Sequence, residues 1–133
     1  MQVLPLRLNP GQDLRVALQA AVREQGCQAA FVLSGIGSLS TAQLRFAAAE
    51  VAQRVDGPTE ILSLSGSIAA NGVHLHMALS TATGEVLGGH VAAGCTVCTT
   101  AEVLLALLPE WEFGREPDAQ TGYEELVVRP RGV

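Results

Sequence analysis

All three histidines of the chain lie within 17 consecutive residues, as His74-Leu75-His76 and, after two glycines, His90. If residues 73–80 form a strand, His74 and His76 point to the same face of it, about 6.5 Å apart. An imidazole from a neighbouring strand could then complete a set of three nitrogen ligands for zinc or another divalent transition metal. Three protein ligands leave one coordination position open, which a catalytic or ligand-sensing metal needs. The spacing therefore predicts a metal site, with half-exposed polar histidines on a strand surface as the simpler alternative.

A few other side chains could serve such a site. A guanidinium such as Arg45 could hold the carboxylate or phosphate of a small-molecule ligand, although a salt bridge is the simpler interpretation. Glu60 or Glu102 could orient a ligand imidazole through a hydrogen bond, with solvated carboxylates as the alternative. Gly88-Gly89 would let the backbone before the third histidine approach the facing strand, or would mark a β-bulge or packing between subunits. These residues do not decide between an enzyme and a sensor, so they assign no reaction.

Two further patterns that can carry chemistry are weaker. Cys95 and Cys98 form a CxxC pair, but residues three apart on an extended strand face opposite ways, and the chain has no second pair. Together with Cys27 they make an odd number of cysteines, which fits a reducing compartment. Residues 34–38, Ser-Gly-Ile-Gly-Ser, lack the spacing of a phosphate-binding loop, and the chain contains no lysine. We expect a tight glycine turn there, and cysteines that are small buried side chains.

Composition limits the kinds of protein that this chain can be. Its 133 residues suit one domain, and 48% of them are hydrophobic against 16% charged. So little polar surface predicts an oligomer that buries its remaining apolar faces between subunits. The net charge is −5 and the pI about 5.0, so direct DNA binding is disfavoured. No apolar stretch approaches the roughly 20 residues of a membrane helix and no signal peptide is recognisable, so we expect a cytoplasmic protein without membrane contact.

Hydrophobic periodicity predicts one helix, over residues 14–25, between a polar entry segment at residues 9–13 and Gly26. Strands are expected at residues 2–8, 29–33, 60–68, 73–81, 85–91 and 123–128. The three strands from residue 60 to residue 91 form a meander, whose first turn is Asn71-Gly72. Alternation places Leu62 and Leu64 on the same face of their strand.

The remaining segments are less regular. Residues 42–48 and 102–108 fit either a strand or a helix, residues 56–58 read as a turn, and residues 111–122 as an exposed loop. The pattern as a whole predicts a single α+β domain over residues 1–133, mainly an antiparallel sheet of about seven or eight strands with one main helix.

Four segments of the chain also occur together in a known family. They are residues 33–40, residues 44–45, residues 57–67 with the block Glu-Ile-Leu-Ser-Leu-Ser-Gly, and residues 84–90 with the block Gly-x-x-x-Gly-Gly. In this order they resemble the plant-and-prokaryote-conserved (PPC) domain family, over about residues 3–128. The resemblance implies a mainly antiparallel sheet that assembles as a homotrimer. In plants, such domains follow AT-hook motifs in nuclear DNA-binding proteins, whereas prokaryotic members usually stand alone and some hold a metal on histidines.

The chain departs from the plant pattern in two ways. It has no Arg-Gly-Arg-Pro AT-hook core, and it carries histidines where plant members carry small or hydroxyl residues. It therefore resembles the histidine-bearing prokaryotic type, for which we expect a homotrimer with zinc or another divalent metal on His74, His76 and His90. The alternative is a DNA-associated or protein-interaction module without a metal.

Overall fold

The computed structural model of the chain describes residues 1–132, which form one helix and eight strands. The main sheet contains β1 (Gln2–Leu8), β2 (Ala29–Arg45), β3 (Gln53–Ala69), β4 (Gly72–Ser80), β5 (Val86–Val91) and β6 (Thr96–Leu107). Its strands are antiparallel, in the order β1-β6-β2-β3-β4-β5. The strands β7 (Trp111–Pro117) and β8 (Glu124–Pro130) form a separate two-stranded sheet. The expected α+β class, with a mainly antiparallel sheet, is confirmed.

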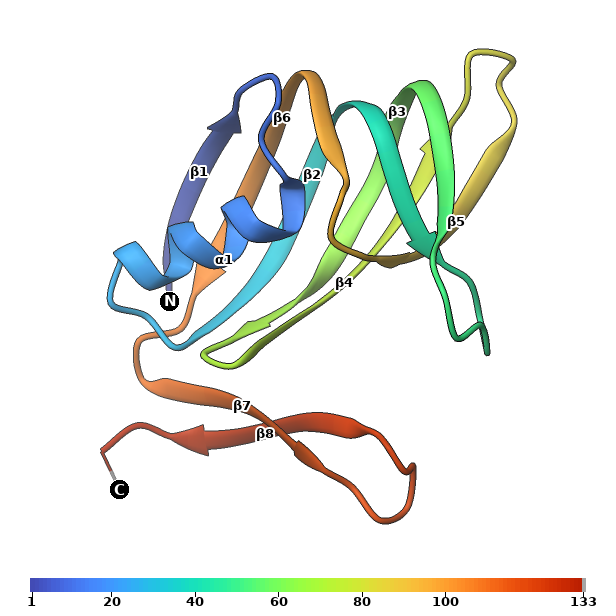
Figure 1. The fold of residues 1–133 in the computed structure, drawn as a ribbon. Helices are drawn as coiled ribbons and strands as arrows, with labels where there is room; N and C mark the ends of the chain where they lie inside the picture. Colours follow the sequence, from blue (N-terminus) through green and yellow to red (C-terminus); the bar gives the residue numbers. More distant parts are fainter. Residues whose placement is uncertain (133) are drawn as a thin grey trace.

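The helix α1 (Leu14–Glu24) crosses one face of the main sheet (Figure 1). It is amphipathic, and its buried side chains recur about once per turn: Leu14, Leu18 and Val22. Each fully buried leucine contributes about 1.5–3 kcal/mol relative to an exposed one. Asp13 caps the helix by accepting from the Val16 N–H at 3.0 Å, and its second oxygen accepts from the Gly94 N–H at 2.7 Å. The same carboxylate thus fixes the start of the helix to the loop before β6. Among residues 1–132, no helix is long and apolar enough to cross a membrane.

The main sheet curls because β5 pairs with two strands. His90 of β5 lies opposite His76 of β4 and also opposite Arg45 of β2. The strands β2, β3, β4 and β5 therefore close on themselves around an apolar interior. The interior side chains of β4 are those that alternation predicts: Val73, Leu75, Met77 and Leu79. The expected meander is confirmed, although its first turn is Ala70-Asn71, one residue earlier than expected.

The expected turn at residues 34–38 is wrong, because β2 runs through it. β2 lies between β3 and β6, and its register against β6 shifts on both sides of this segment. A side chain at Gly37 would meet the Thr100 carbonyl oxygen at 2.5 Å, and the φ of Gly37 is +149°. The glycines therefore permit close packing within a long, bulged strand. β3 continues in the same way through the expected turn at residues 56–58. Of the two ambiguous segments, residues 42–45 and 102–107 form the ends of β2 and β6, and residues 46–48 lie beyond the end of β2.

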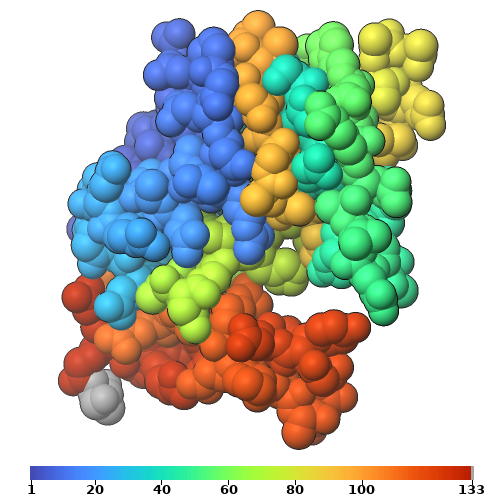
Figure 2. All heavy atoms as spheres, in the orientation of Figure 1, coloured from blue at the N-terminus to red at the C-terminus, as the bar shows by residue number. Residues whose placement is uncertain are grey.

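Two more expectations are wrong. The first half of the expected loop at residues 111–122 is β7, whose Phe113 is 5% exposed and packs edge-on against Phe31 of β2. In β3, a bulge after Ile61 turns the strand, so Leu62 is 52% exposed whereas Leu64 is 4% exposed. An extra residue in one strand reverses the faces that follow it, and the hydrophobic period alone does not reveal it. Figure 2 shows the hairpin of β7 and β8 as a layer below the main sheet, with a hollow between them.

Candidate metal centre

The structure brings the three histidines together on the face of β4 that is opposite the core. His76 and His90 are cross-strand partners, and His74 lies two residues before His76 on β4. His76 Nε2 lies 3.1 Å from His74 Nε2 and 3.1 Å from His90 Nδ1. One ligand atom from each ring lies within 4.8 Å of the others. Within residues 1–132, no second group of His, Cys, Asp and Glu side chains is placed to hold a metal ion.

Two of the three separations between these nitrogens are close to those of a tetrahedral site, and the third is no longer than 4.8 Å. With Zn–N bonds of about 2.0–2.1 Å, the ligand nitrogens of a tetrahedral site lie about 3.3 Å apart. Hydrogen bonds alone do not satisfy these nitrogens well. In a neutral imidazole, a ring nitrogen carries either one N–H or one lone pair, whereas His76 Nε2 faces two ring nitrogens at once. A divalent cation accepts a lone pair from all three nitrogens at once. Three imidazoles suit zinc and its transition-metal neighbours, whereas calcium and magnesium take oxygen ligands.

Two of the histidines are held in the neutral form that a metal requires. Burial lowers the pKa of His74 below 6.5, and the nearby positive charges of His76 and Arg115 lower it further. Burial also lowers the pKa of His90, with a further contribution from Arg45. Metal ligands bind through the deprotonated nitrogen. Near pH 7, the lowered pKa values favour the neutral imidazoles that can bind a cation.

Gly89 allows β5 to reach both of its neighbours. A Cβ atom at this position would lie 2.8 Å from the carbonyl oxygen of Arg45, closer than real side chains approach. The close backbone approach expected from the glycine pair is confirmed: Gly89 approaches β2, and an added Cβ at Gly88 would lie 2.9 Å from the Met77 carbonyl oxygen of β4. This crossing sets the position of His90 opposite His76.

Arg45 lies beside the histidines, in register with His90. Its Nη1 donates to the Ala49 carbonyl oxygen at 3.1 Å. Among residues 1–132, the salt bridges are those of Arg54 with Asp56 and of Arg129 with Glu116, so Arg45 has none. The simpler interpretation of Arg45, a salt bridge, is therefore not what the structure shows.

The two glutamates lie apart from the cluster. Glu60 is paired with Ser80, four residues along β4 from His76, which is about 13 Å on a strand. Glu102 lies on β6, paired with Ile36 of β2. Among residues 1–132, no carboxylate oxygen hydrogen-bonds to a histidine ring. The structure thus joins Arg45 to the histidines and leaves both glutamates away from them.

The CxxC pair lies elsewhere. Cys95 is buried, and its sulfur accepts from the Gln43 N–H at 3.3 Å. Burial raises the pKa of the Cys95 thiol, which keeps it protonated and unreactive. Cys98 is partly exposed on β6.

Reasoning from the sequence missed Arg15. It lies in the first turn of α1, and its Nη1 donates to the Val91 carbonyl oxygen at 3.2 Å, across 76 residues of sequence. A cavity of about 330 Å³ is lined by Arg15, Arg45, His74 and His90. No local pattern marks Arg15, because its role depends on the helix lying across the end of β5.

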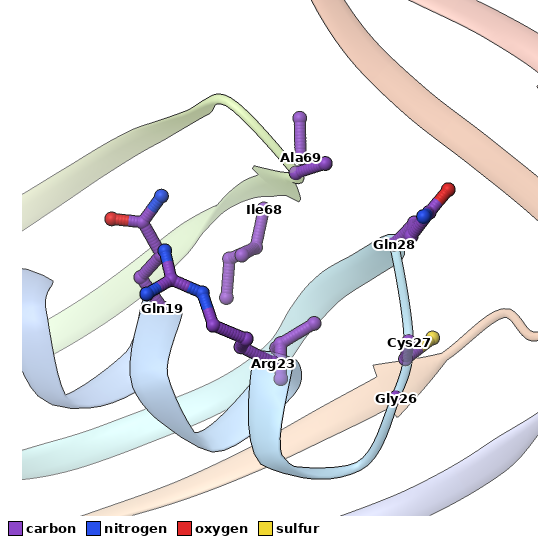
Figure 3. Close-up of a pocket in the computed structure, with 9 residues that line it drawn as sticks. Gln19, Arg23, Gly26, Cys27, Gln28, Ile68 and Ala69 are labelled. Carbon is purple, nitrogen blue, oxygen red and sulfur yellow. The ribbon is translucent and has the colours of Figure 1, made fainter.

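A second hollow, of about 240 Å³, lies at the C-terminal end of α1 (Figure 3). Its wall includes Arg23 and Gln19 from the helix and Ile68 from β3. Cys27 also lines it and donates its S–H to the Ala29 carbonyl oxygen at 3.1 Å. Because this hollow has no cluster of titratable groups, we assign it no role.

The fold and the site together define a curled antiparallel domain with a three-histidine centre. Residues 1–109 match the model of the Plants and Prokaryotes Conserved (PCC) domain, and the chain belongs to this family. Two relatives from Synechococcus strains, each called Bifunctional protein GlmU, are 48% identical over 130 residues and 50% identical over 128 residues. The chain corresponds to 21% of the length of each.

Solved structures share the fold. A hypothetical protein from Salmonella cholerae-suis (Salmonella enterica) has a TM-score of 0.94 at 40% identity, with 98% of this chain and 94% of that chain covered. A protein from Archaeoglobus fulgidus, described as metal-containing, has a TM-score of 0.82 at 31% identity, with 96% and 94% covered. A Bacteroides thetaiotaomicron protein, described as a candidate DNA-binding protein, has a TM-score of 0.84 at 21% identity, with 94% and 91% covered, and shows the fold alone.

Proposed function

We propose that this chain is a homotrimeric, metal-binding PCC-domain protein that holds zinc or another divalent transition metal on His74, His76 and His90. One observation carries the proposal: His76 Nε2 lies 3.1 Å from a ring nitrogen of each of the other two histidines. This convergence depends on the alternation of side chains along β4 and on the register that sets His90 of β5 opposite His76. The relative from Archaeoglobus fulgidus, described as metal-containing, supports the same interpretation.

Three protein ligands leave a coordination position for water or a ligand oxygen. A metal there would polarise a carbonyl group or activate water. Glu60 and Glu102 lie away from the rings, so neither is placed to transfer a proton at the site. We therefore propose binding of a small-molecule ligand at the metal as the function and assign no reaction to it.

The homotrimer is supported by an apolar outer face of the sheet. Leu33 and Ile36 of β2 and Leu62 of β3 are 51%, 54% and 52% exposed. They lie on central strands, where a monomer would present them to water. A subunit interface would remove this area from solvent. The three free cysteines fit the proposed cytoplasmic location.

The alternative is a DNA-associated or protein-interaction module without a metal. Its support is the description of the Bacteroides thetaiotaomicron structure, which shares only the fold. The net charge of −5 opposes contact with a polyanion. The convergent histidines also have no role in such a module.

Elemental analysis of the purified protein tests the proposal. The protein is expressed without a histidine tag, incubated with zinc and desalted, and compared with His76→Ala and with Ser80→Ala. Ser80 is the matched control, because it lies on the same face of β4 four residues further along. We expect near-stoichiometric metal in the wild type and in Ser80→Ala, and none in His76→Ala. A metal-free wild type would make the module without a metal the better interpretation.

A further inference from the structure

Beside the histidines, the curled sheet has an opening. β4 and β5 are paired from Ser80 and Val86 to His76 and His90, and there they separate because β5 turns to pair with β2. Beyond this point, residues 73–75 of β4 do not pair with residues 91–93, which are the last residue of β5 and the two that follow it. The space between them is the cavity of about 330 Å³. It lies within the size range of small-molecule sites.

The charged groups that line this cavity are all cationic or potential metal ligands. Arg15 enters from α1 and Arg45 from β2, and His74 and His90 form part of the wall. No aspartate or glutamate lines the cavity, although the chain has 13 acidic residues and a net charge of −5. The opening is therefore a positive site on an acidic protein.

Both arginines have donors to spare. Arg15 gives one hydrogen bond, to the Val91 carbonyl oxygen, and Arg45 gives one, to the Ala49 carbonyl oxygen. A guanidinium has five N–H donors, and among residues 1–132 neither arginine forms a salt bridge. Arg15 is partly buried, and this loss of water lowers its pKa. The nearby Asp13 carboxylate opposes this lowering of the pKa, but its two oxygens accept from the backbone N–H groups of Val16 and Gly94 and it forms no salt bridge with Arg15. A bound anion would offset the cost of this partly buried charge.

Two further charges lie near His74. Arg115 of β7 lowers the pKa of this histidine, whereas Glu125 of β8 raises it. Arg115 is itself engaged, because its Nη2 donates to the Ser67 hydroxyl oxygen at 2.8 Å. These two charges oppose each other at His74, and neither residue lines the cavity, whose lining arginines are Arg15 and Arg45.

We propose that this cavity binds a small organic anion, whose carboxylate or phosphate group is held by Arg15 and Arg45 beside the three histidines. The proposal deepens the metal-binding function and rests on it only for a second contact, from the anion to the open position of the metal. Arginine suits this task because its planar fork of donors matches the oxygens of both groups. A carboxylate and a phosphate both present negatively charged oxygens to the arginines, and titration with one probe of each kind distinguishes between them.

Isothermal titration calorimetry of the zinc-loaded protein tests this site, with malonate as the carboxylate probe and inorganic phosphate as the phosphate probe. Wild type is compared with Arg15→Gln, Arg45→Gln and the control Arg7→Gln, which removes one charge from β1, the opposite edge of the sheet from β5. We expect saturable binding of at least one probe, weakened roughly tenfold or more in the two cavity variants. Arg7→Gln should bind like the wild type.

The outcomes separate the two proposals. Binding of malonate alone assigns a carboxylate ligand, and binding of phosphate alone assigns a phosphorylated one. Absence of saturable binding for both probes, or equal binding by folded Arg15→Gln and Arg45→Gln variants, would overturn the anion site while the metal content stands. The same titrations are repeated on His76→Ala protein, which lacks the metal site, with and without Arg15→Gln or Arg45→Gln. Binding that persists in His76→Ala and is weakened by the arginine substitutions supports the anion site even if the wild type proves metal-free.

Discussion

At the scale of single residues, the geometry of the three-histidine cluster follows from the alternation of side chains along β4 and from the pairing of β5 with β4. Alternation places His74 and His76 on one face of β4, and the register of β5 adds His90. Residue types and spacing were sufficient to predict this set of three. They were not sufficient for Arg15, whose contact with the Val91 carbonyl depends on how α1 packs.

Proton binding should oppose both folding and metal binding at this cluster. Burial holds the pKa of His74 and of His90 below the 6.5 of the unfolded chain. Below pH 6.5 the unfolded chain therefore binds more protons than the folded protein, and the free energy of unfolding falls. This contribution is fully present above 6.5 and is lost as the pH falls through the folded pKa values.

Urea denaturation of the chelator-treated protein at about pH 7.5 and about pH 5.5 measures this effect, since most carboxylates remain ionised over that range. We expect lower stability at the lower pH. A His74→Gln, His90→Gln double variant should show a smaller difference between the two conditions. An unchanged difference in that variant would assign the pH dependence to other groups.

At the scale of elements, the sequence was informative where one pattern held without interruption. The helix α1 and the strand β4 follow simple periods, and both were predicted. The sequence divides β2 because Gly35 and Gly37 look like turn residues. In the structure, Gly37 lies close to the backbone of β6 and Gly35 lies close to the Leu64 side chain of β3. The sequence of β7 indicates a loop because Gly114 and the last residue of the strand, Pro117, are poor strand formers. Only its packing against Phe31 reveals the strand.

The crossing of β5 over β2 should be sensitive to one methyl group. In Gly89→Ala, the new Cβ would lie 2.8 Å from the Arg45 carbonyl oxygen, so one strand must shift. We expect a loss of about 1–3 kcal/mol in the free energy of unfolding, as in other overpacked sites. His90 should move with the strand, so metal content should also fall.

Gly114→Ala in β7 is the matched control, because the nearest atom to its added Cβ lies at 3.9 Å. Its stability should change by less than about 0.5 kcal/mol. Denaturant unfolding with elemental analysis measures both quantities. A Gly89→Ala protein with unchanged stability and full metal content would show that the crossing does not set the site.

At the scale of the whole molecule, apolar side chains remain on the outer face of the sheet after folding. α1 covers one face of the sheet, and the hairpin of β7 and β8 lies below it (Figure 1). Phe113 of β7 packs edge-on against Phe31 of β2. Leu33 and Ile36 lie further along β2 and stay more than half exposed. With Leu62 of β3, these side chains form a group of exposed apolar residues on the central strands, which favours contact between subunits over a monomer.

A carboxylate in this face should break the proposed trimer. Burying an unpaired charge costs several kcal/mol, so Leu33→Glu should dissociate subunits that meet at β2. Val16→Glu is the matched control, because Val16 is 59% exposed on α1, and a glutamate in a first helical turn is favourable. Light scattering during size exclusion should give three times the 13.8 kDa of one chain for the wild type and for Val16→Glu, and a lower mass for Leu33→Glu. A wild type with the mass of one chain would remove the trimer and leave the histidine site intact, because all three of its ligands come from a single chain.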